Sequence, residues 1–278
     1  MNLEAVKDYK VLVIGDAIYD KYVFVSALGK SIKESVLSVS FSRAEEYKGG
    51  VWAAAEHLKT LCNVSVWHGD KTTTNTRYIE EVYNRKLFTL HESRQESSSP
   101  YSGELPFIKD YDIVIVVDFG HGTMTKEMID RVTNEARFLA VNTQTNSQNF
   151  GFNLITKYPR ADYVVVDELE ARPAAHDKDS LIEDVILKLG YKRIAVTLGA
   201  HGAIGFDGEF HREKAFNDRV VDTMGAGDAF LCVSAPFVKA RFSIKDIVHI
   251  GNAAGAIKMG KLGHRGSVTK AELEAHLL

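Results

Sequence analysis

The sequence predicts an α/β fold in which helices cover both faces of a mostly parallel central sheet and a small second sheet lies beside it. Three observations support this fold class. Short runs rich in Val and Ile, such as 10–15 and 163–166, are typical of strands buried on both faces of a parallel sheet. From residue 113 onward such runs alternate with helical segments, which predicts right-handed crossovers. Alternating polar and apolar residues at about 21–45 and 72–90 predict strands with one solvated face, which form the small sheet.

The first part of the chain contains one core strand, the strands of the small sheet and one alanine-rich helix that Gly49-Gly50 opens. A serine-rich segment before residue 105 has the composition of a mobile surface loop. The elements expected here are strands at 10–15, 21–25, 35–41 and 64–67, a helix at 51–61, a hairpin at 72–90 with its turn at Asn84-Arg85, and the loop at 92–104.

The second part has the regular alternation of an open α/β sheet. Ligands of such sheets bind beyond the carboxyl ends of the strands. Asp16, Asp20, Asp118 and Asp167 follow predicted strands and so favour one common cleft, although an Asp there is often only a helix cap or turn former. The expected elements are strands at 113–117, 138–141, 163–166 and 193–198, helices at 126–136 and 180–189, a hairpin of 203–206 with 210–213, and helices at 226–239, 244–259 and 269–277.

Composition excludes several classes of protein. The net charge of −3 argues against nucleic acid as a main partner, because a surface that follows phosphates needs a basic excess. The two cysteines, Cys62 and Cys232, form no disulfide framework and have no metal-ligand spacing, and we expect Cys232 to be a buried, inert thiol. The first ten residues are mixed and charged, unlike a signal peptide, and we expect a cytoplasmic protein with no membrane partner.

The chemistry is predicted by the string Asp222-Thr-Met-Gly-Ala-Gly-Asp228, which runs directly into an apolar helix. Gly225 and Gly227 allow backbone N–H groups to turn toward a ligand, and the helix directs the positive end of its dipole to the same place. This combination forms an anion hole. An aspartate beside a bound triphosphate is suited to accept the proton of an attacking hydroxyl, so Asp228 is the candidate general base. Gly-x-Gly-Asp alone would suit a plain turn with an Asp cap equally well, but the full string is far more specific.

This string resembles the C-terminal signature of the PfkB/ribokinase family of carbohydrate kinases, and the resemblance extends over most of the chain. It implies a ribokinase-like three-layer α/β/α fold with a small β-sheet lid, formed by one kinase domain over 1–278. It also implies transfer of the γ-phosphoryl group of ATP to a sugar hydroxyl, with Mg²⁺ as cofactor. Within the string the resemblance assigns Gly225, Ala226 and Gly227 to the anion hole and Asp228 to the base.

Other motifs extend the resemblance to both substrates. Asp20, at the end of Gly15-Asp-Ala-Ile-Tyr-Asp20, and the Gly49-Gly50 turn match the positions that hold the sugar. Asp167-x-x-Glu170 resembles the family's Asn-x-x-Glu, which organises Mg²⁺ and phosphates, here through water. The nucleotide positions that the resemblance implies are Asn142, Asp167, Glu170, Thr197, Gly199, Gly202, Asp222, Thr223 and Asn252. Family members often bind K⁺ through backbone carbonyls, and the comparable positions are Asp222, Thr223, Gly263 and Ser267.

Within the family the chain is most similar to the heptose-7-phosphate kinase branch, which phosphorylates C1 of a sugar phosphate. The shared pieces are Gly15-Asp-x-x-x-Asp-Lys-Tyr22, Thr74-x-Thr-Arg77, Asp118-Phe-Gly-His-Gly122, and Gly260-Lys-Leu-Gly263 with Ser267-Val268. A second phosphate needs a cationic clamp, for which Arg77 and Lys86 are candidates, although such side chains on a hairpin are more often merely solvated. Asp118 joins the substrate-side candidates, and His121 is not expected to be catalytic. No nucleotidylyltransferase sequence follows Leu278, so we expect only the kinase step.

The chain departs from the family pattern at three places. Trp52, Ala53 and Ala54 stand where a sugar-binding Asn is common. Asn142-Thr-Gln144 replaces the Asp-Pro-Lys of heptose kinases. One βα unit is missing after residue 70, which narrows one edge of the sheet or exposes a surface that a second subunit covers. We expect a homodimer through the lid sheet.

Two alternatives of different kind remain at this point. The acceptor could be a nucleoside, since one fold serves both substrate classes. The chain could also be a catalytically degenerate binding or assembly subunit. Retention of Asp228 and of the complete anion-hole string argues against degeneracy, whereas the lost Asn and the missing unit argue for it.

Overall fold

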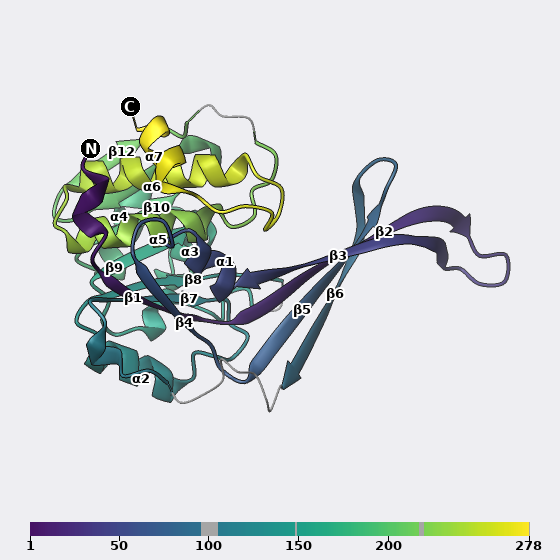
Figure 1. The fold of residues 1–278 in the computed structure, drawn as a ribbon, viewed down its shortest axis with the longest axis horizontal. Coiled ribbons are helices and arrows are strands. Elements are labelled where there is room, and N and C mark those ends of the chain that lie inside the picture. The colour runs from purple at the N-terminus through teal and green to yellow at the C-terminus, as the bar shows by residue number, and fades with distance from the viewer. Residues whose placement is uncertain (96–104, 148, 217–219, 278) are drawn as a thin grey trace.

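The computed structural model describes residues 1–95, 105–147, 149–216 and 220–277. An eight-stranded sheet with the order β12-β11-β10-β9-β8-β7-β1-β4 forms the body (Figure 1). Neighbours from β4 to β10 are parallel, and β11 and β12 add antiparallel at one edge. The predicted α/β fold class is confirmed. The strands are β1 (Lys10–Gly15), β4 (Asn63–Trp67), β7 (Ile113–Asp118), β8 (Leu139–Thr143), β9 (Tyr163–Asp167), β10 (Ile194–Thr197), β11 (Ala203–Phe206) and β12 (Phe210–Glu213).

Helices cover both faces of this sheet because its central strands are apolar on both sides. In β1, Val11 and Val13 pack into one hydrophobic cluster with α5 and α6, whereas Leu12 and Ile14 pack into a second cluster with α2, α3 and α4. This alternation produces three layers. The helices are α1 (Val51–Glu56), α2 (Lys126–Glu135), α3 (Glu168–Ala174), α4 (Ile182–Leu189), α5 (Ala226–Lys239), α6 (Ile244–Met259) and α7 (Lys270–His276).

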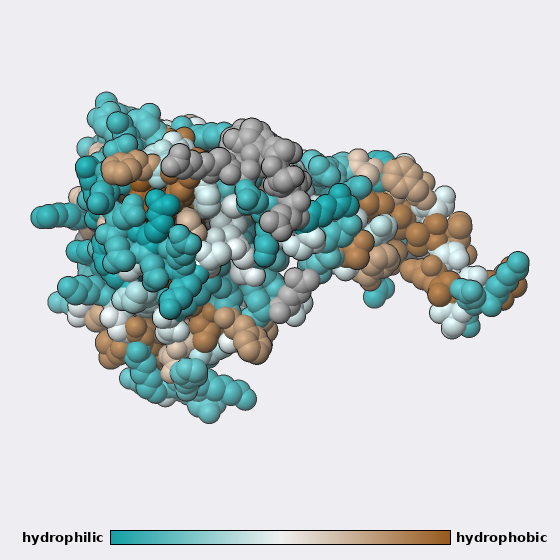
Figure 2. All heavy atoms as spheres, turned by 90° about the horizontal axis from the view of Figure 1, so that it is seen from below, coloured by the Kyte–Doolittle hydropathy of each residue, from teal (hydrophilic) through white to brown (hydrophobic). Residues whose placement is uncertain are grey.

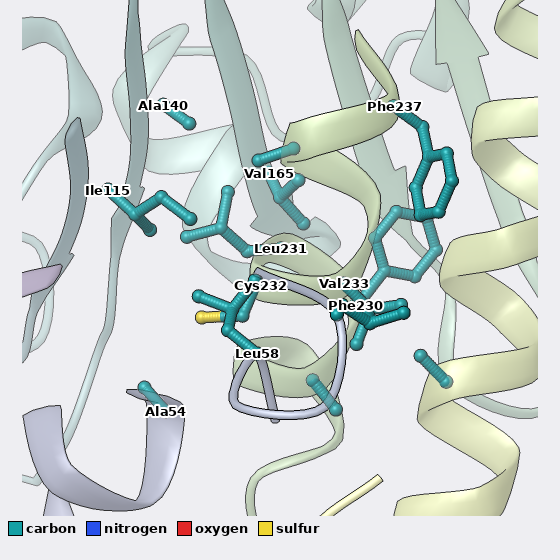
Figure 3. Close-up of a cluster of buried hydrophobic side chains, with 14 of the residues drawn as sticks. Ala54, Leu58, Ile115, Ala140, Val165, Phe230, Leu231, Cys232, Val233 and Phe237 are labelled. Carbon is teal, nitrogen blue, oxygen red and sulfur yellow. The ribbon is translucent and has the colours of Figure 1, made fainter. Parts of the chain in front are cut away.

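Helix α5 is the best-buried helix, and its burial positions the anion-hole string at its start. Figure 3 shows Leu231 and Cys232 of α5 in the cluster that also contains Ile115 and Leu58. Each fully buried Leu or Phe contributes on the order of 1.5–3 kcal/mol through lost apolar exposure. The Cys232 thiol is fully buried, as predicted, and burial raises its pKa well above the usual range.

A separate four-stranded sheet, the lid sheet, projects from the body (Figure 1). Its order is β3-β2-β5-β6, with β2 and β5 parallel and the outer pairs antiparallel. The strands extend beyond the predicted ranges 21–45 and 72–90, because the end of β2 is exposed on both faces and shows no alternation in sequence. Only residues 68–70 separate β4 from the lid sheet, so β4 is the edge of the large sheet. The lid strands are β2 (Ala17–Lys30), β3 (Leu37–Gly50), β5 (Lys71–Glu80) and β6 (Arg85–Gln95).

Other segments also differ from the sequence expectation. The first helix ends at Glu56 rather than at residue 61. Helix α3 was not predicted because Pro173 lies inside it, but Asp167 and Glu170 form a capping box that starts the helix immediately after β9. Residues 92–95 of the predicted loop belong to β6, and 96–104 lie outside the described residues. Among the described helices, none is both long enough and apolar enough to span a bilayer.

Candidate functional site

A cavity of about 410 Å³ lies at the carboxyl ends of the central strands, between the starts of α3 and α5. The ends of β8, β9 and β10 contribute its floor, and α6 contributes Asn252 to its wall. The structure thereby brings together segments that are separated by more than a hundred residues in the sequence. Its predicted members are Asn142, Asp167, Glu170, Thr197, Gly199, Gly202, Thr223, Gly225, Ala226, Gly227, Asp228 and Asn252.

The anion-hole string forms the start of α5. Gly225 is the N-cap and has φ 76° and ψ 9°, a left-handed conformation that disfavours residues with a side chain. The N–H of Ala229 bonds back to the carbonyl of Gly225 at 3.0 Å, while a Cβ on Gly227 would meet no atom within 4 Å. The first turn of a helix leaves N–H groups without intrahelical partners, so this turn offers donors and a positive dipole end to an anion in the cavity.

Asp228 lies in this first turn and is 6 % exposed. Burial raises the pKa of its carboxyl to about 6, and the nearby His264 and Lys258 side chains oppose this rise. The Nε2 of Gln144 donates a hydrogen bond to Oδ1 of Asp228. The carboxylate is therefore ionised at neutral pH but more basic than an exposed aspartate, which suits a general base.

Asp167 at the end of β9 and Glu170 in the first turn of α3 fit a divalent cation bound with a nucleotide. Glu170 accepts hydrogen bonds from the N–H groups of Asp167 (2.9 Å) and Thr145 (2.8 Å). Burial raises the pKa of Glu170 to about 8, and burial likewise raises the pKa of Asp167. The buried Oδ1 of Asn142 has no hydrogen-bond partner. These oxygen donors match the ligands that Mg²⁺ prefers.

The described residues contain no cluster of three or more His, Cys, Asp or Glu side chains that could bind a metal ion by themselves. Mg²⁺ usually keeps several waters and binds through one or two carboxylates together with substrate phosphates. The pair Asp167 and Glu170 fits that mode of binding rather than a closed protein cage.

On the substrate side, the structure joins Asp20, Arg77 and Gly49. Asp20 is 3 % exposed, and its Oδ1 accepts a hydrogen bond from Nη1 of Arg77. Its Oδ2 lies 2.8 Å from Nε2 of His264. These partners lower the pKa of the Asp20 carboxyl against the effect of its burial. A Cβ on Gly49 would lie 2.3 Å from Asp20 Oδ2, so only glycine permits the turn to approach this carboxylate; Gly50 follows as the N-cap of α1.

The Asp118 carboxylate forms hydrogen bonds and an ion pair within the protein. Its Oδ2 accepts hydrogen bonds from the hydroxyl of Tyr158 (2.6 Å), while Lys157 forms an ion pair with it at 2.6 Å. Its Oδ1 accepts from the N–H of Gly120 at 3.0 Å. The neighbouring Asp16 carboxylate accepts from the N–H of His121 and orders the same loop. The two aspartates shape the loop after β7 with their own hydrogen bonds.

Four other candidates lie away from the large cavity: Lys86, Asp222, Gly263 and Ser267. Lys86 and Asp222 line a second cavity of about 210 Å³, under the lid sheet. Asp222 organises its own loop, because its carboxylate accepts from the N–H groups of Met224 (3.1 Å) and Gly263 (3.0 Å). The carbonyl of Ser267 accepts a hydrogen bond from Nζ of Lys261.

Sequence reasoning did not identify three residues of this region. Gln144 was visible only as a departure from the family pattern, and it contacts Asp228. His264 directly follows the quoted Gly260–Gly263 piece, and this position is the one signal that could have suggested it. Lys258 gave no signal, because a lysine near the end of a helix ordinarily lies in solvent.

Residues 62–271 match the family described as pfkB family carbohydrate kinase. The chain is 23% identical over 298 residues to the bifunctional protein HldE of Aliarcobacter butzleri, covering 92% of this chain and 62% of that protein. It is 34% identical over 118 residues to the ribokinase of Lactococcus lactis, covering 42% of this chain and 38% of that protein. The chain thus spans less than two thirds of the length of these relatives.

Solved structures share the fold. The ribokinase of Thermotoga maritima superposes with a TM-score of 0.71 at 16% identity, covering 97% of this chain and 99% of that chain. The phosphofructokinase-2 of Escherichia coli in complex with potassium gives 0.71 at 14% identity, covering 97% and 98%. A Burkholderia thailandensis nucleoside kinase in complex with inosine gives 0.70 at 17% identity, covering 96% of each chain.

Proposed function

This chain belongs to the pfkB family of carbohydrate kinases, and on that basis we propose that it transfers the γ-phosphoryl group of ATP to a hydroxyl of a sugar phosphate. One observation carries the proposal. Asp228, a buried carboxylate whose pKa is raised to about 6, stands in the first turn of α5 on the wall of the cavity that the nucleotide-side residues line. A base next to an anion hole is the arrangement that phosphoryl transfer to a hydroxyl requires.

The proposed reaction uses these groups as follows. Asp228 accepts the proton of the acceptor hydroxyl while the hydroxyl oxygen forms a bond to the γ-phosphorus. The bond from that phosphorus to the bridging oxygen breaks, and ADP leaves with the electron pair. N–H groups of residues 225–227 stabilise the charge on the transferred group. Asp167 and Glu170 would bind Mg²⁺ through water, and Mg²⁺ supplies neutralisation of phosphate charge.

The sugar-phosphate acceptor is supported by the cluster around Asp20. Asp20 is the proposed acceptor of sugar hydroxyl protons, and the Gly49 turn leaves room beside it. The Arg77 guanidinium has five N–H donors, of which Asp20 takes one at Nη1, so it has donors for a phosphate. We further propose that the acceptor resembles a heptose phosphate. This more specific proposal depends on the sequence motifs around Arg77 and Gly263.

An ADP-release assay tests the proposal. We expect activity with sugar phosphates, less with free sugars, and none with nucleosides. The variant Asp228→Asn should reduce kcat by roughly 10²–10⁴ while ATP binding, followed by calorimetry, is retained, as expected of a lost general base. Asp130→Asn, at an exposed carboxylate of α2, is the matched control.

The other outcomes discriminate the alternatives. Preference for nucleosides would assign the chain to the nucleoside kinases of this fold. ATP binding without turnover of any acceptor would indicate a degenerate binding subunit. Full activity of Asp228→Asn would refute the mechanism.

We further propose that the protein is a homodimer through the lid sheet. Phe41, Phe88 and Leu90 are 67%, 53% and 47% exposed, and Figure 2 shows apolar surface over the lid. Strand register and alternation assign the three to the face opposite Arg77. A second copy covering this face would bury them. Light scattering should give twice the chain mass, and Phe41→Glu with Phe88→Glu should give the monomer; a wild-type monomer would refute the proposal.

A further inference from the structure

Lys258 is a buried lysine that neither the resemblance nor the proposed reaction accounts for. It lies in the last turn of α6 and is 1 % exposed, among the largest fully buried side chains. Lysine is almost never fully buried unless its charge is paired. Its Nζ donates a hydrogen bond to the carbonyl of Gly263 at 2.7 Å.

The Lys258 side chain lies beside the anion hole. A Cβ on Gly225, the N-cap of α5, would be 3.2 Å from Cε of Lys258, 3.8 Å from its Nζ, and 4.0 Å from Oδ2 of Asp228. Burial lowers the pKa of Lys258, whereas the charges of Asp222 and Asp228 raise it. The ammonium therefore lies between the 222–228 string and the loop after α6, with a carboxylate on each end of the string.

The same place is where the resemblance implies a monovalent cation. That cation would need free oxygens from Asp222, Thr223, Gly263 and Ser267. The Gly263 carbonyl accepts from Lys258, and the Ser267 carbonyl accepts from Lys261. The Thr223 carbonyl accepts from the N–H of Ala226 at 3.4 Å. Both Asp222 carboxylate oxygens accept backbone N–H groups. These residues do not fit K⁺, because the ammonium groups of Lys258 and Lys261 already lie on two of the four expected oxygens and would repel a further cation.

We infer that Lys258 is a tethered cation that takes the place of a free monovalent ion beside the anion hole. An ammonium and K⁺ carry the same charge, and both are satisfied by carbonyl oxygens. The tethered group needs no binding equilibrium, so it is present at every salt concentration. Lys258 is a positioning residue: it links the Gly263 loop to Gly225 and compensates the buried charge of Asp228. The effect of Lys258 on the reaction rate, as we infer it, depends on the proposed kinase function.

Removing the side chain should open a path for an ion. Lys258 lines a cavity of about 270 Å³ that is also lined by His264, Gly266 and Ser267. Truncation to alanine would connect this cavity to the Gly263 carbonyl oxygen that the ammonium now contacts. A small cation could then enter from solution and bind the Gly263 carbonyl.

The experiment measures kcat and the KM for ATP over a range of KCl, with tetramethylammonium chloride keeping ionic strength constant. Wild-type kcat should not respond to K⁺. Lys258→Ala should lose roughly 10²-fold in kcat without K⁺, comparable to the loss of one preorganised electrostatic group in an active site. K⁺ or methylammonium should restore at least a tenth of the wild-type rate.

Three further variants test whether charge at this position is what matters. Lys258→Arg should retain activity. Lys258→Met, which fills the space without charge, should stay inactive and should not respond to K⁺ or methylammonium. Lys245→Ala, at an exposed lysine of α6, is the control.

A second readout does not depend on activity. The Tm of Lys258→Ala should rise in KCl relative to tetramethylammonium chloride, and the Tm of wild type should not. Activation of wild type by K⁺, full activity of Lys258→Met, or a Lys258→Ala variant that neither cation rescues would each overturn the inference. If wild type turns over no acceptor, the proposed function fails, and the Tm comparison still decides the role of Lys258.

Discussion

The Nε2 of His264 lies 2.8 Å from Oδ2 of Asp20 and joins two residues that are 244 positions apart in the chain. Asp20 belongs to the lid strand β2, and His264 belongs to the loop between α6 and α7. Their side chains are 4% and 8% exposed. This contact connects the lid sheet with the loop that also contacts Lys258, and it orients the carboxylate proposed to bind the acceptor.

Replacing His264 should weaken acceptor binding more than it slows chemistry. In His264→Ala the Asp20 carboxylate loses one of its two partners, so we expect the KM for the acceptor to rise roughly tenfold, the equivalent of one charged hydrogen bond. The KM for ATP should change little. Steady-state kinetics with each substrate varied measures both. His176→Asn is the control, because His176 is exposed and its φ of 50° is tolerated by Asn. An unchanged acceptor KM would contradict the proposed role.

The Gly49 turn should not accept even a methyl group. A Cβ there would lie 2.3 Å from Oδ2 of Asp20 and 2.9 Å from Nε2 of His264, so Gly49→Ala must displace one of these groups. We expect acceptor kcat/KM to fall by roughly 10²-fold, as misplacement near the chemistry does. Gly69→Ala is the control, since its Cβ would meet no atom closer than 3.6 Å. Equal activity of the two variants would show that the turn does not position the acceptor.

The pH dependence of the reaction should report Asp228. Burial raises the pKa of this carboxyl to about 6, and only the ionised form accepts a proton. The rate should therefore be constant above pH 7 and fall as pH decreases through about 6, approaching roughly tenfold per pH unit. The profile of kcat/KM for the acceptor measures this in the free enzyme. A flat profile down to pH 5 would exclude Asp228 as the base.

The ionised Asp228 carboxylate should also lower the free energy of unfolding. Its folded pKa, about 6, exceeds the ordinary 3.8, so the folded state favours the neutral form. The stability that the protonated carboxyl contributes to the folded state is fully present below pH 3.8 and is lost as pH rises through about 6. Asp228→Asn should therefore be more stable than wild type at pH 8, by on the order of 1–3 kcal/mol, and nearly equal at pH 4. Urea unfolding at both pH values, with Asp130→Asn as control, checks this; a less stable variant at pH 8 would show that the ionised carboxylate contributes to folding.

Local sequence patterns were sufficient to predict the fold class and most of its strands and helices. Buried strands such as β1 and β7 are apolar on both faces. The predicted turn at Asn84-Arg85 is displaced, because the turn between β5 and β6 occupies residues 81–84 and Arg85 already pairs with Glu80. Helix α3 was not predicted, since its capping box competes with Pro173 and only the three-dimensional cap decides the outcome. The ends of the lid strands were likewise not visible, because exposed strand residues follow no periodicity.

The sequence by itself determined which segment we propose as the anion hole and its base. Residues 222–228 are contiguous, and their function depends on local backbone geometry at the start of one helix. The tertiary structure alone decided the contacts of His264, Lys258 and Asp118, on which their proposed roles depend. Each depends on partners brought together by folding: Asp20 for His264, Gly225 and Gly263 for Lys258, and Tyr158 for Asp118. The charge and hydrogen bonding of a buried side chain are set by such distant neighbours, which no local pattern contains.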